Sequence, residues 1–255
     1  MSRVNRLVGL ARSLAIYHGI PRRHRRLRRF YAAFVSPGDL VFDIGAHAGN
    51  RTRAFAAIGC RVVAVEPQPD FARLLRALFA GSSHVRIVEA AVGRTPGRAA
   101  LSISERTPTV TTLDENWRDA RGREPDFSHV RWDGRVEVET TTLDALIEQF
   151  ATPAFVKIDV EGGEPGVLAG LSSALASLSF EYLPRALDYV SRCTERLNAL
   201  GRYEFNWSSG ESCRLAADRW MTAAELMTSL GTPDAQRCPG DVYARLVLPS
   251  PRPSA

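Results

Sequence analysis

Two carboxylates stand two positions apart after an apolar run, where they could do acid–base chemistry. The run covers residues 154–158, and Asp159 and Glu161 follow it. If the strand continues that far, alternate side chains project to the same side, so the two carboxylates lie together. Neighbouring carboxylates raise each other's pKa, which favours a base that acts near neutral pH. The same oxygens could share a divalent cation, with Glu164 or Glu181 as a further ligand.

A structural role is the alternative for these acidic residues. Asp and Glu near the start of a helix can satisfy the free amide groups of its first turn. We predict Asp159, Glu161 and Glu181 as the catalytic residues, with Glu164 as a further candidate. No residue is assigned as a metal ligand, and a divalent cation remains an open alternative. Lys157, the only lysine of the chain, lies inside the apolar run and is expected to be an ion-paired structural residue.

A glycine turn follows an earlier apolar run at residues 40–44. Gly45 and Gly49 bracket three residues of this turn, and glycine lets the backbone turn tightly and approach a ligand closely. The spacing is G-x-x-x-G, whereas a dinucleotide site uses G-x-G-x-x-G to place a pyrophosphate on a helix N-terminus. We therefore expect a cofactor without a diphosphate bridge, which argues against an NAD-dependent oxidoreductase.

Single carboxylates lie at the ends of the neighbouring apolar runs. Glu66 follows residues 61–65, where a carboxylate can accept hydrogen bonds from both hydroxyls of a ribose. Glu89 follows residues 85–88 and is expected beside an adenine, while Asp43 is expected to bind a charged amino-acid portion of the cofactor. The predicted cofactor-binding residues are Asp43, Gly45, Ala46, His47, Gly49, Asn50, Glu66, Pro67 and Glu89.

The elements that must position these residues alternate between strand and helix patterns. This alternation predicts an α/β fold with a mainly parallel, doubly wound, Rossmann-like sheet and helices on both faces. In such sheets ligands bind beyond the carboxyl ends of the strands. Residues 104–134 are polar and are expected to form a long loop with short helices. The predicted strands are 40–44, 61–65, 85–88, 98–103, 136–140, 154–158, 178–181, 203–207 and 242–248, and the predicted helices include 71–79, 143–150, 165–175 and 185–200.

Three motifs in this order resemble the FkbM family of methyltransferases. They are V-F-D-I-G-A-H-A-G-N at residues 41–50, V-E-P at 65–67 and V-K-I-D-V-E-G-G-E at 156–164, and the resemblance covers roughly residues 36–248. It implies a class I methyltransferase fold, S-adenosylmethionine as the methyl donor and O-methylation of hydroxyls on sugars, glycolipids or polyketides. The sequence departs from the family pattern at His47, where Asn is more common, and at Gly163, where Ala is common.

The function expected from these observations is O-methylation of a small-molecule hydroxyl. A nucleic-acid methyltransferase is one alternative, but residues 159–162 read D-V-E-G rather than the Asn/Asp-Pro-Pro-aromatic pattern of base-modifying enzymes. A non-catalytic module that binds S-adenosylmethionine is the other alternative. We expect a small-molecule acceptor and no nucleic acid. Residues 104–134 and the region after Glu181 should set specificity, and four aromatic residues there either flank a sugar or belong to the core: Trp117, Trp132, Tyr182 and Trp207.

The basic residues of the chain concentrate near its N-terminus. The net charge is +5, and residues 22–29 contain six arginines and one histidine. We interpret this run as a solvated helix, with peripheral contact to an anionic membrane as the alternative. The predicted organisation is a basic helical N-terminal arm over residues 1–35, with a break at residues 19–21, a methyltransferase domain over 36–248 and a flexible tail over 249–255.

Composition places the chain among ordinary globular proteins. Hydrophobic residues make up 45% and charged residues 24%. No stretch approaches the roughly 18 consecutive apolar residues that a membrane helix needs, and the N-terminus lacks a signal-peptide pattern. The four cysteines are far apart and are expected to be free thiols. We therefore expect a cytoplasmic protein.

Overall fold

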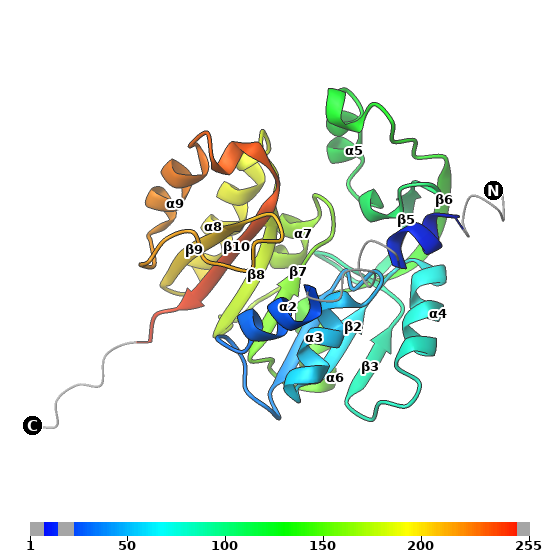
Figure 1. Cartoon of the computed structure of the whole chain (residues 1–255), viewed down its shortest axis with the longest axis horizontal. Coiled ribbons are helices and arrows are strands. Elements are labelled where there is room, and N and C mark those ends of the chain that lie inside the picture. Colours follow the sequence, from blue (N-terminus) through cyan, green and yellow to red (C-terminus); the bar gives the residue numbers. More distant parts are fainter. Residues whose placement is uncertain (1–7, 15–22, 249–255) are drawn as a thin grey trace, which may run out of the picture.

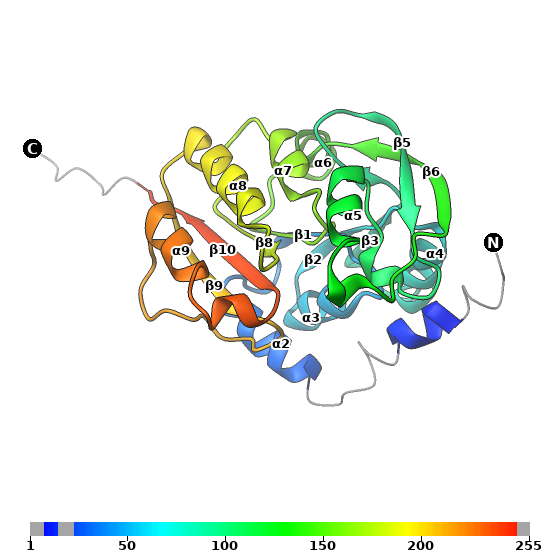
Figure 2. The same ribbon diagram turned by 90° about the horizontal axis from the view of Figure 1, so that it is seen from above.

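The computed structural model describes residues 8–14 and 23–248, so the predicted break at 19–21 and the tail at 249–255 lie outside the described residues. A seven-stranded sheet forms the centre of the molecule, in the order β3-β2-β1-β7-β8-β10-β9 (Figures 1 and 2). All its neighbouring strands are parallel except at β10, which runs antiparallel to both of its neighbours. The strands are β1 (Leu40–Ile44), β2 (Arg61–Val65), β3 (Val85–Val88), β7 (Phe155–Ile158), β8 (Ser177–Tyr182), β9 (Tyr203–Ser209) and β10 (Gly240–Leu246).

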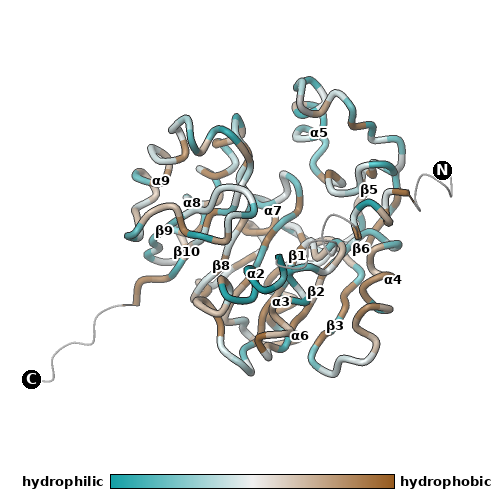
Figure 3. Tube along the Cα trace, in the orientation of Figure 1, coloured by the Kyte–Doolittle hydropathy of each residue, from teal (hydrophilic) through white to brown (hydrophobic). Residues whose placement is uncertain are grey.

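Helices cover both faces of this sheet, which confirms the predicted Rossmann-like architecture. Alternate residues of the buried strands supply two separate apolar clusters, because successive side chains of a strand point to opposite faces. Helices α2 (Arg23–Tyr31), α3 (Asn50–Ile58) and α4 (Pro69–Leu78) pack on one face. The opposite face packs against α6 (Leu143–Phe150), α7 (Glu164–Ala169), α8 (Leu187–Leu200) and α9 (Ala223–Leu230). The apolar colour of the central strands in Figure 3 follows this burial.

A second sheet of three strands lies beside the first and frames the predicted long loop. It has the order β4-β6-β5, with β4 at Ala91–Val92, β5 at Gly97–Ile103 and β6 at Gly134–Thr141. Between β5 and β6 the chain forms helix α5 (Glu115–Arg121) and two short 3-10 helices, η1 (Pro108–Val110) and η2 (Pro125–Phe127). This excursion, residues 104–133, stands above the carboxyl ends of the central strands (Figure 1). It is therefore placed to cover a site at that edge.

Helix α2 carries the arginine run but is anchored to the sheet by its other side. Leu27 and Tyr31 are buried, and the Tyr31 ring packs against Phe55 and Phe155 at centroid distances of 4.5 and 5.9 Å. The solvated-helix interpretation therefore describes only one side of α2. The trace of this helix is largely hydrophilic in Figure 3. None of the helices that the structure describes combines the length and apolar composition needed to span a bilayer.

The structure differs from the sequence expectation at several elements. The helix expected at 165–175 ends at Ala169, and Leu171 and Leu175 then enter the core from non-helical backbone. Helix α9 has no counterpart among the expected helices, although Thr222 and Glu225 form a capping box at its start. The isolated sequence shows where apolar residues recur, but tertiary packing decides where a short helix stops.

Candidate active site

A cleft lies at the carboxyl ends of β1, β2 and β7. Its walls are the turn after β1, the end of β2, residues 90–92, residues 108–113 and the turn after β7, and it encloses about 900 Å³ when the space open to solvent is counted. This position agrees with the rule that open α/β sheets bind ligands beyond their strand ends. Seven of the nine predicted cofactor-binding residues line it: Asp43, Gly45, Ala46, His47, Asn50, Glu66 and Pro67.

The turn after β1 requires glycine for two different reasons. Gly45 has a φ of 80°, and a Cβ atom there would lie 1.8 Å from the backbone oxygen of Asp159. Gly49 caps α3 with a φ of 77°, and a Cβ atom there would meet the Leu75 side chain at 2.7 Å. Both positions therefore combine left-handed backbone with no room for a side chain. Gly49 shapes the turn without lining the cleft.

His47 occupies left-handed backbone within the same turn and closes one side of the cleft. Its φ is 45°, and its ring stacks on Phe71 at a centroid distance of 4.0 Å. Burial lowers the pKa of His47 to about 4, with the Asp159 carboxylate opposing that shift. The ring is therefore neutral at physiological pH and is too weak a base to serve as the proton acceptor.

Glu66 organises the floor of the cleft. One carboxylate oxygen accepts the backbone N–H of His47 and the other accepts that of Gln68, each at 2.8 Å. Burial raises the pKa of Glu66 to about 7, although those two backbone hydrogen bonds lower it. Each oxygen keeps acceptor capacity for a further donor. The carboxylate can therefore hold the turn and accept ligand hydroxyls together.

The side-chain amide of Asn50 indicates that the cleft binds a polar ligand. Its side chain lines the cleft and is only 8% exposed, yet Nδ2 has no hydrogen-bond partner within the part of the chain that the structure describes. A buried donor without a partner costs free energy, and a ligand that accepts this hydrogen bond removes the cost. Asn50 thus fits a ligand with a polar group near the start of α3.

A buried ion-pair network connects the cleft to the sheet. Lys157 is fully buried on β7, and its Nζ lies 2.8 Å from Asp241 Oδ1 and 3.3 Å from Asp159 Oδ2. Burial lowers the pKa of Lys157, but the carboxylates of Asp159 and Asp241 outweigh that effect and raise the pKa above its usual range. The ammonium group is therefore charged and fixes the Asp159 side chain at the edge of the cleft. This agrees with the structural role expected for Lys157.

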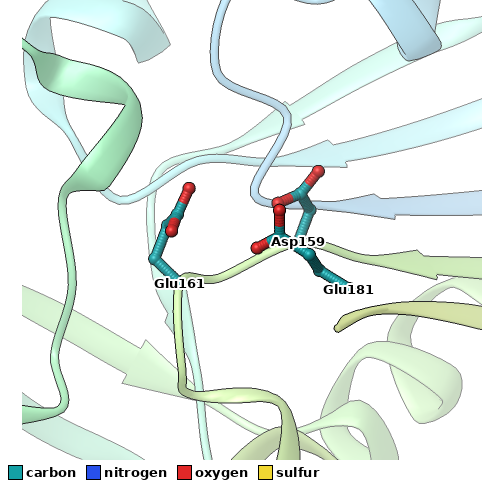
Figure 4. A group of neighbouring side chains, drawn as sticks. All are labelled: Asp159, Glu161 and Glu181. Carbon is teal, nitrogen blue, oxygen red and sulfur yellow. The ribbon is translucent and has the colours of Figure 1, made fainter. Parts of the chain in front are cut away.

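Three carboxylates meet where β7 and β8 end. One oxygen from each of Asp159, Glu161 and Glu181 lies within 4.8 Å of the others. Figure 4 shows these three side chains at the strand ends. Burial is the largest cause that raises the pKa of Glu161 and of Glu181, and the neighbouring carboxylates raise both further. We call these three residues the acidic centre. Such a cluster can share a proton or a cation.

The loop after β7 is held in shape by its own residues. Glu164 accepts the backbone N–H groups of Val160 and Gly162, each at 3.0 Å, so it closes the loop rather than facing a ligand. Gly162 has a φ of 91°, and a Cβ atom there would lie 2.3 Å from the Trp117 ring. Helix α5 therefore packs directly on this loop. The excursion is therefore packed against the loop that carries Glu161 of the acidic centre.

The structure separates the other sequence candidates. Glu89 does not line the cleft and instead pairs with Arg76 at 2.6 Å, while the next residue, Ala90, does line it. Trp117, Tyr182 and Trp207 are core residues, and Trp132 is half-buried with its indole N–H donated to the Val110 carbonyl. Residues that the sequence prediction missed also line the cleft, namely Arg51, Gln68, Thr111 and Thr112. Arg51 directly follows the glycine turn, and Thr111 and Thr112 belong to the loop that was expected to set specificity, but none of the three was singled out.

The chain is similar to known methyltransferases, both in a family model and among solved structures. A family model described as the methyltransferase FkbM domain matches residues 43–197, more than half of the chain. No curated protein sequence matches the chain. Similar solved structures include an O-methyltransferase from Bacillus cereus in complex with SAH, at 12% identity, 97% coverage of this chain, 92% of that chain and a TM-score of 0.48. A TehB-like SAM-dependent methyltransferase from Corynebacterium glutamicum is 10% identical over 87% of this chain and 88% of that chain, with a TM-score of 0.44.

The family match spans the glycine turn, Glu66 and the loop that carries Asp159 and Glu161. It therefore covers the cleft and all three carboxylates of the acidic centre. The chain belongs to the FkbM family of methyltransferases and is an S-adenosylmethionine-dependent methyltransferase.

Proposed function

We propose that this methyltransferase transfers a methyl group to a hydroxyl oxygen of a small molecule such as a sugar, a glycolipid or a polyketide. The observation that carries the proposal is the acidic centre at the edge of the cleft. A neutral alcohol is a poor nucleophile, so its proton must be removed as the new bond forms. Burial and the neighbouring carboxylates raise the pKa of Glu161 and of Glu181, which makes each of them a stronger base than an exposed carboxylate.

The cleft residues supply the contacts that a nucleoside methyl donor needs. Glu66 offers carboxylate oxygens to the ribose hydroxyls, and Asn50 offers its unpartnered amide to a polar group of the donor. Asp43 is buried beneath the turn and accepts the Thr52 hydroxyl at 2.5 Å. When bound, S-adenosylmethionine supplies an electrophilic methyl group. The chain's own residues place an acceptor oxygen and take its proton.

Different contacts fix the positions of Asp159 and Glu161 within the acidic centre. Asp159 is fixed by Lys157, and Glu161 lies on left-handed backbone with a φ of 54°. The backbone oxygen of Glu161 accepts the Thr112 hydroxyl at 2.6 Å, so residues 108–113 help set this conformation. We propose that the centre removes the proton either directly or through a divalent cation that the three carboxylates share. Orientation of the hydroxyl against these fixed groups supplies a further part of the rate enhancement.

Donor binding should depend on the ionisation of Glu66. Because burial raises the pKa of this carboxyl to about 7, the acceptor form that binds ribose hydroxyls predominates above that pH and is lost below it. The dissociation constant for S-adenosylhomocysteine should therefore rise on going from about pH 8 to about pH 6, approaching tenfold per pH unit at the acid end. Isothermal titration calorimetry measures this dependence.

The Glu66→Ala variant is the control for that pH dependence. It removes a charged acceptor worth about 1.5–3 kcal/mol, so binding should be roughly 10- to 150-fold weaker and should no longer vary with pH in this range. An equal affinity at both ends of the range for the unmodified protein would show that Glu66 does not bind the donor.

The proposed acceptor chemistry is tested by a screen with labelled donor. Glycosides, glycolipids and polyketides that carry free hydroxyls are incubated with the protein and S-adenosylmethionine whose methyl group is labelled. We expect label in at least one hydroxyl compound and none in RNA or DNA. Label only in nucleic acid would replace this proposal with the alternative function.

A further inference from the structure

A second cavity lies between the excursion and the turn after β8. It encloses about 940 Å³, including space open to solvent, and η3 (Ala235–Arg237) forms part of its rim. Residues 107–112 form a wall that this cavity shares with the cleft of the candidate active site. Thr107 and Val110 line the cavity, whereas Pro108, Thr109 and Thr111 line the cleft. Leu183, in the turn that follows Glu181 by two residues, also lines it. We call it the acceptor cavity.

The charge of this cavity is opposite to that of the acidic centre. The described residues that line it include three arginines, Arg121, Arg185 and Arg237, and a single carboxylate, Glu124. Phe127 and Leu183 add apolar surface. Ligand pockets commonly combine an apolar wall with a few charged groups that fix the orientation of the ligand.

Arg121 is a buried cation whose hydrogen bonds are incompletely satisfied. Its side chain is 7% exposed, and Nη2 lies 3.0 Å from Glu124 Oε1. Its Nε is buried and has no partner within residues 8–14 and 23–248. An unsatisfied donor on a buried charge is costly, and a bound anion would satisfy it. Arg121 therefore indicates that the cavity binds a ligand with an anionic group.

Arg185 provides a second cation from the opposite wall. It is exposed, and its φ of 64° places a non-glycine residue in the left-handed region. Backbone strain of this kind persists where the surrounding structure fixes the residue, and it concentrates at ligand clamps. The Arg185 guanidinium has no ion pair with any residue that the structure describes, whereas Arg237 pairs with Asp234 at 3.3 Å. Arg185 is thus available to a ligand.

We propose that the methyl acceptor carries an anionic oxygen-acid group, either a phosphate or a carboxylate, which binds Arg121 and Arg185 in the acceptor cavity. This inference rests on the proposed hydroxyl methylation. Guanidinium groups bind both anions through charge-assisted, often paired hydrogen bonds. In this arrangement the anionic group of the acceptor binds the arginines, and its neutral hydroxyl reaches the acidic centre.

Binding of three small probes tests the inference. Saturable binding of inorganic phosphate, glucuronate and the neutral methyl glucoside is measured by ligand-detected NMR, with and without S-adenosylhomocysteine. We expect at least one anion to bind about tenfold more tightly than methyl glucoside. Phosphate alone would indicate a phosphorylated acceptor, whereas glucuronate alone would indicate a carboxylated one.

Matched arginine variants locate the anion. Arg185→Gln should weaken anion binding by roughly tenfold or more, because one charge-assisted contact is lost. Arg121→Met should do the same, but since Arg121 is buried the exposed Arg185 is the decisive position. Arg86, an exposed arginine on β3, lies outside the cavity, so Arg86→Gln should bind anions like the unmodified protein.

Two results would overturn the inference: no saturable anion binding, or equal anion binding by Arg185→Gln and Arg86→Gln. These results leave the proposed function standing if S-adenosylhomocysteine still binds and neutral hydroxyl compounds are methylated. Conversely, anion binding that depends on Arg185, together with methylation of a non-hydroxyl atom, would retain the cavity as an anion site and remove the proposed function. The two failures are therefore distinguishable.

Discussion

Asp159→Asn should lower kcat by about 10²- to 10⁴-fold, while affinity for S-adenosylmethionine changes little. The substitution keeps the size of the side chain and removes the charge that Lys157 binds at 3.3 Å. Asp159 also belongs to the acidic centre with Glu161 and Glu181, so its loss removes part of the proton-accepting group. Steady-state kinetics on an acceptor found by the screen, with calorimetry for the donor, measures both quantities.

Chelation separates the two forms of this mechanism. If the acidic centre acts directly as the base, EDTA leaves the turnover of the unmodified protein unchanged. If a shared cation is required, EDTA abolishes turnover and added Mg²⁺ restores it. Glu195 lies exposed on α8, and Glu195→Gln is the matched control that should keep full activity. Full turnover by both Asp159→Asn and Glu161→Gln would show that proximity and orientation carry the reaction without this centre.

Lys157→Met should destabilise the fold by about 3–5 kcal/mol, because it leaves the buried Asp241 carboxylate without its closest cation. Lys157 is fully buried, and its Nζ lies 2.8 Å from Asp241 Oδ1. Arg51, at 3.7 Å from Asp241 Oδ2, replaces only part of this attraction. Thermal unfolding should show a midpoint lower by roughly 10 °C, since each kcal/mol shifts a domain of this size by about 2–4 °C.

Two companion variants identify the cause of that destabilisation. Lys157→Met combined with Asp241→Asn removes both buried charges and should recover a large part of the lost stability. Arg98→Met breaks an exposed ion pair with Glu137 on the small sheet and should leave the midpoint nearly unchanged. If Lys157→Met unfolds at the same temperature as the unmodified protein, the ion pair contributes no net stability.

The central sheet was predictable because its strands are short apolar runs separated by turn residues. Residues 40–44 and 61–65 were expected as strands and form β1 and β2 with those bounds. The small sheet was not recognised as a separate unit. Its strands β5 and β6 alternate in the same way as a strand of any sheet, and only their pairing across the excursion of residues 104–133 distinguishes them.

The site was predictable where a residue directly follows a strand. Glu66 and Asp159 line the cleft for that reason, and Asp43 lines it from the penultimate position of β1. Glu89 has the same sequence context, yet an ion pair with Arg76 turns it away from the cleft. Residues 104–134 were expected to set specificity, but nothing singled out Arg121 among them, because it reaches the acceptor cavity through the packing of α5 on the loop after β7. Contacts between segments far apart in the chain determine such placements.

The measurement that tests the central claim most directly is the position of the transferred methyl group. An acceptor found by the screen is treated with S-adenosylmethionine that carries an isotope-labelled methyl group, and the product is identified by NMR. The account predicts label on a hydroxyl oxygen, with product formation suppressed by about 10²-fold or more in Asp159→Asn. Label on nitrogen or carbon, or undiminished O-methylation by Asp159→Asn, would contradict it.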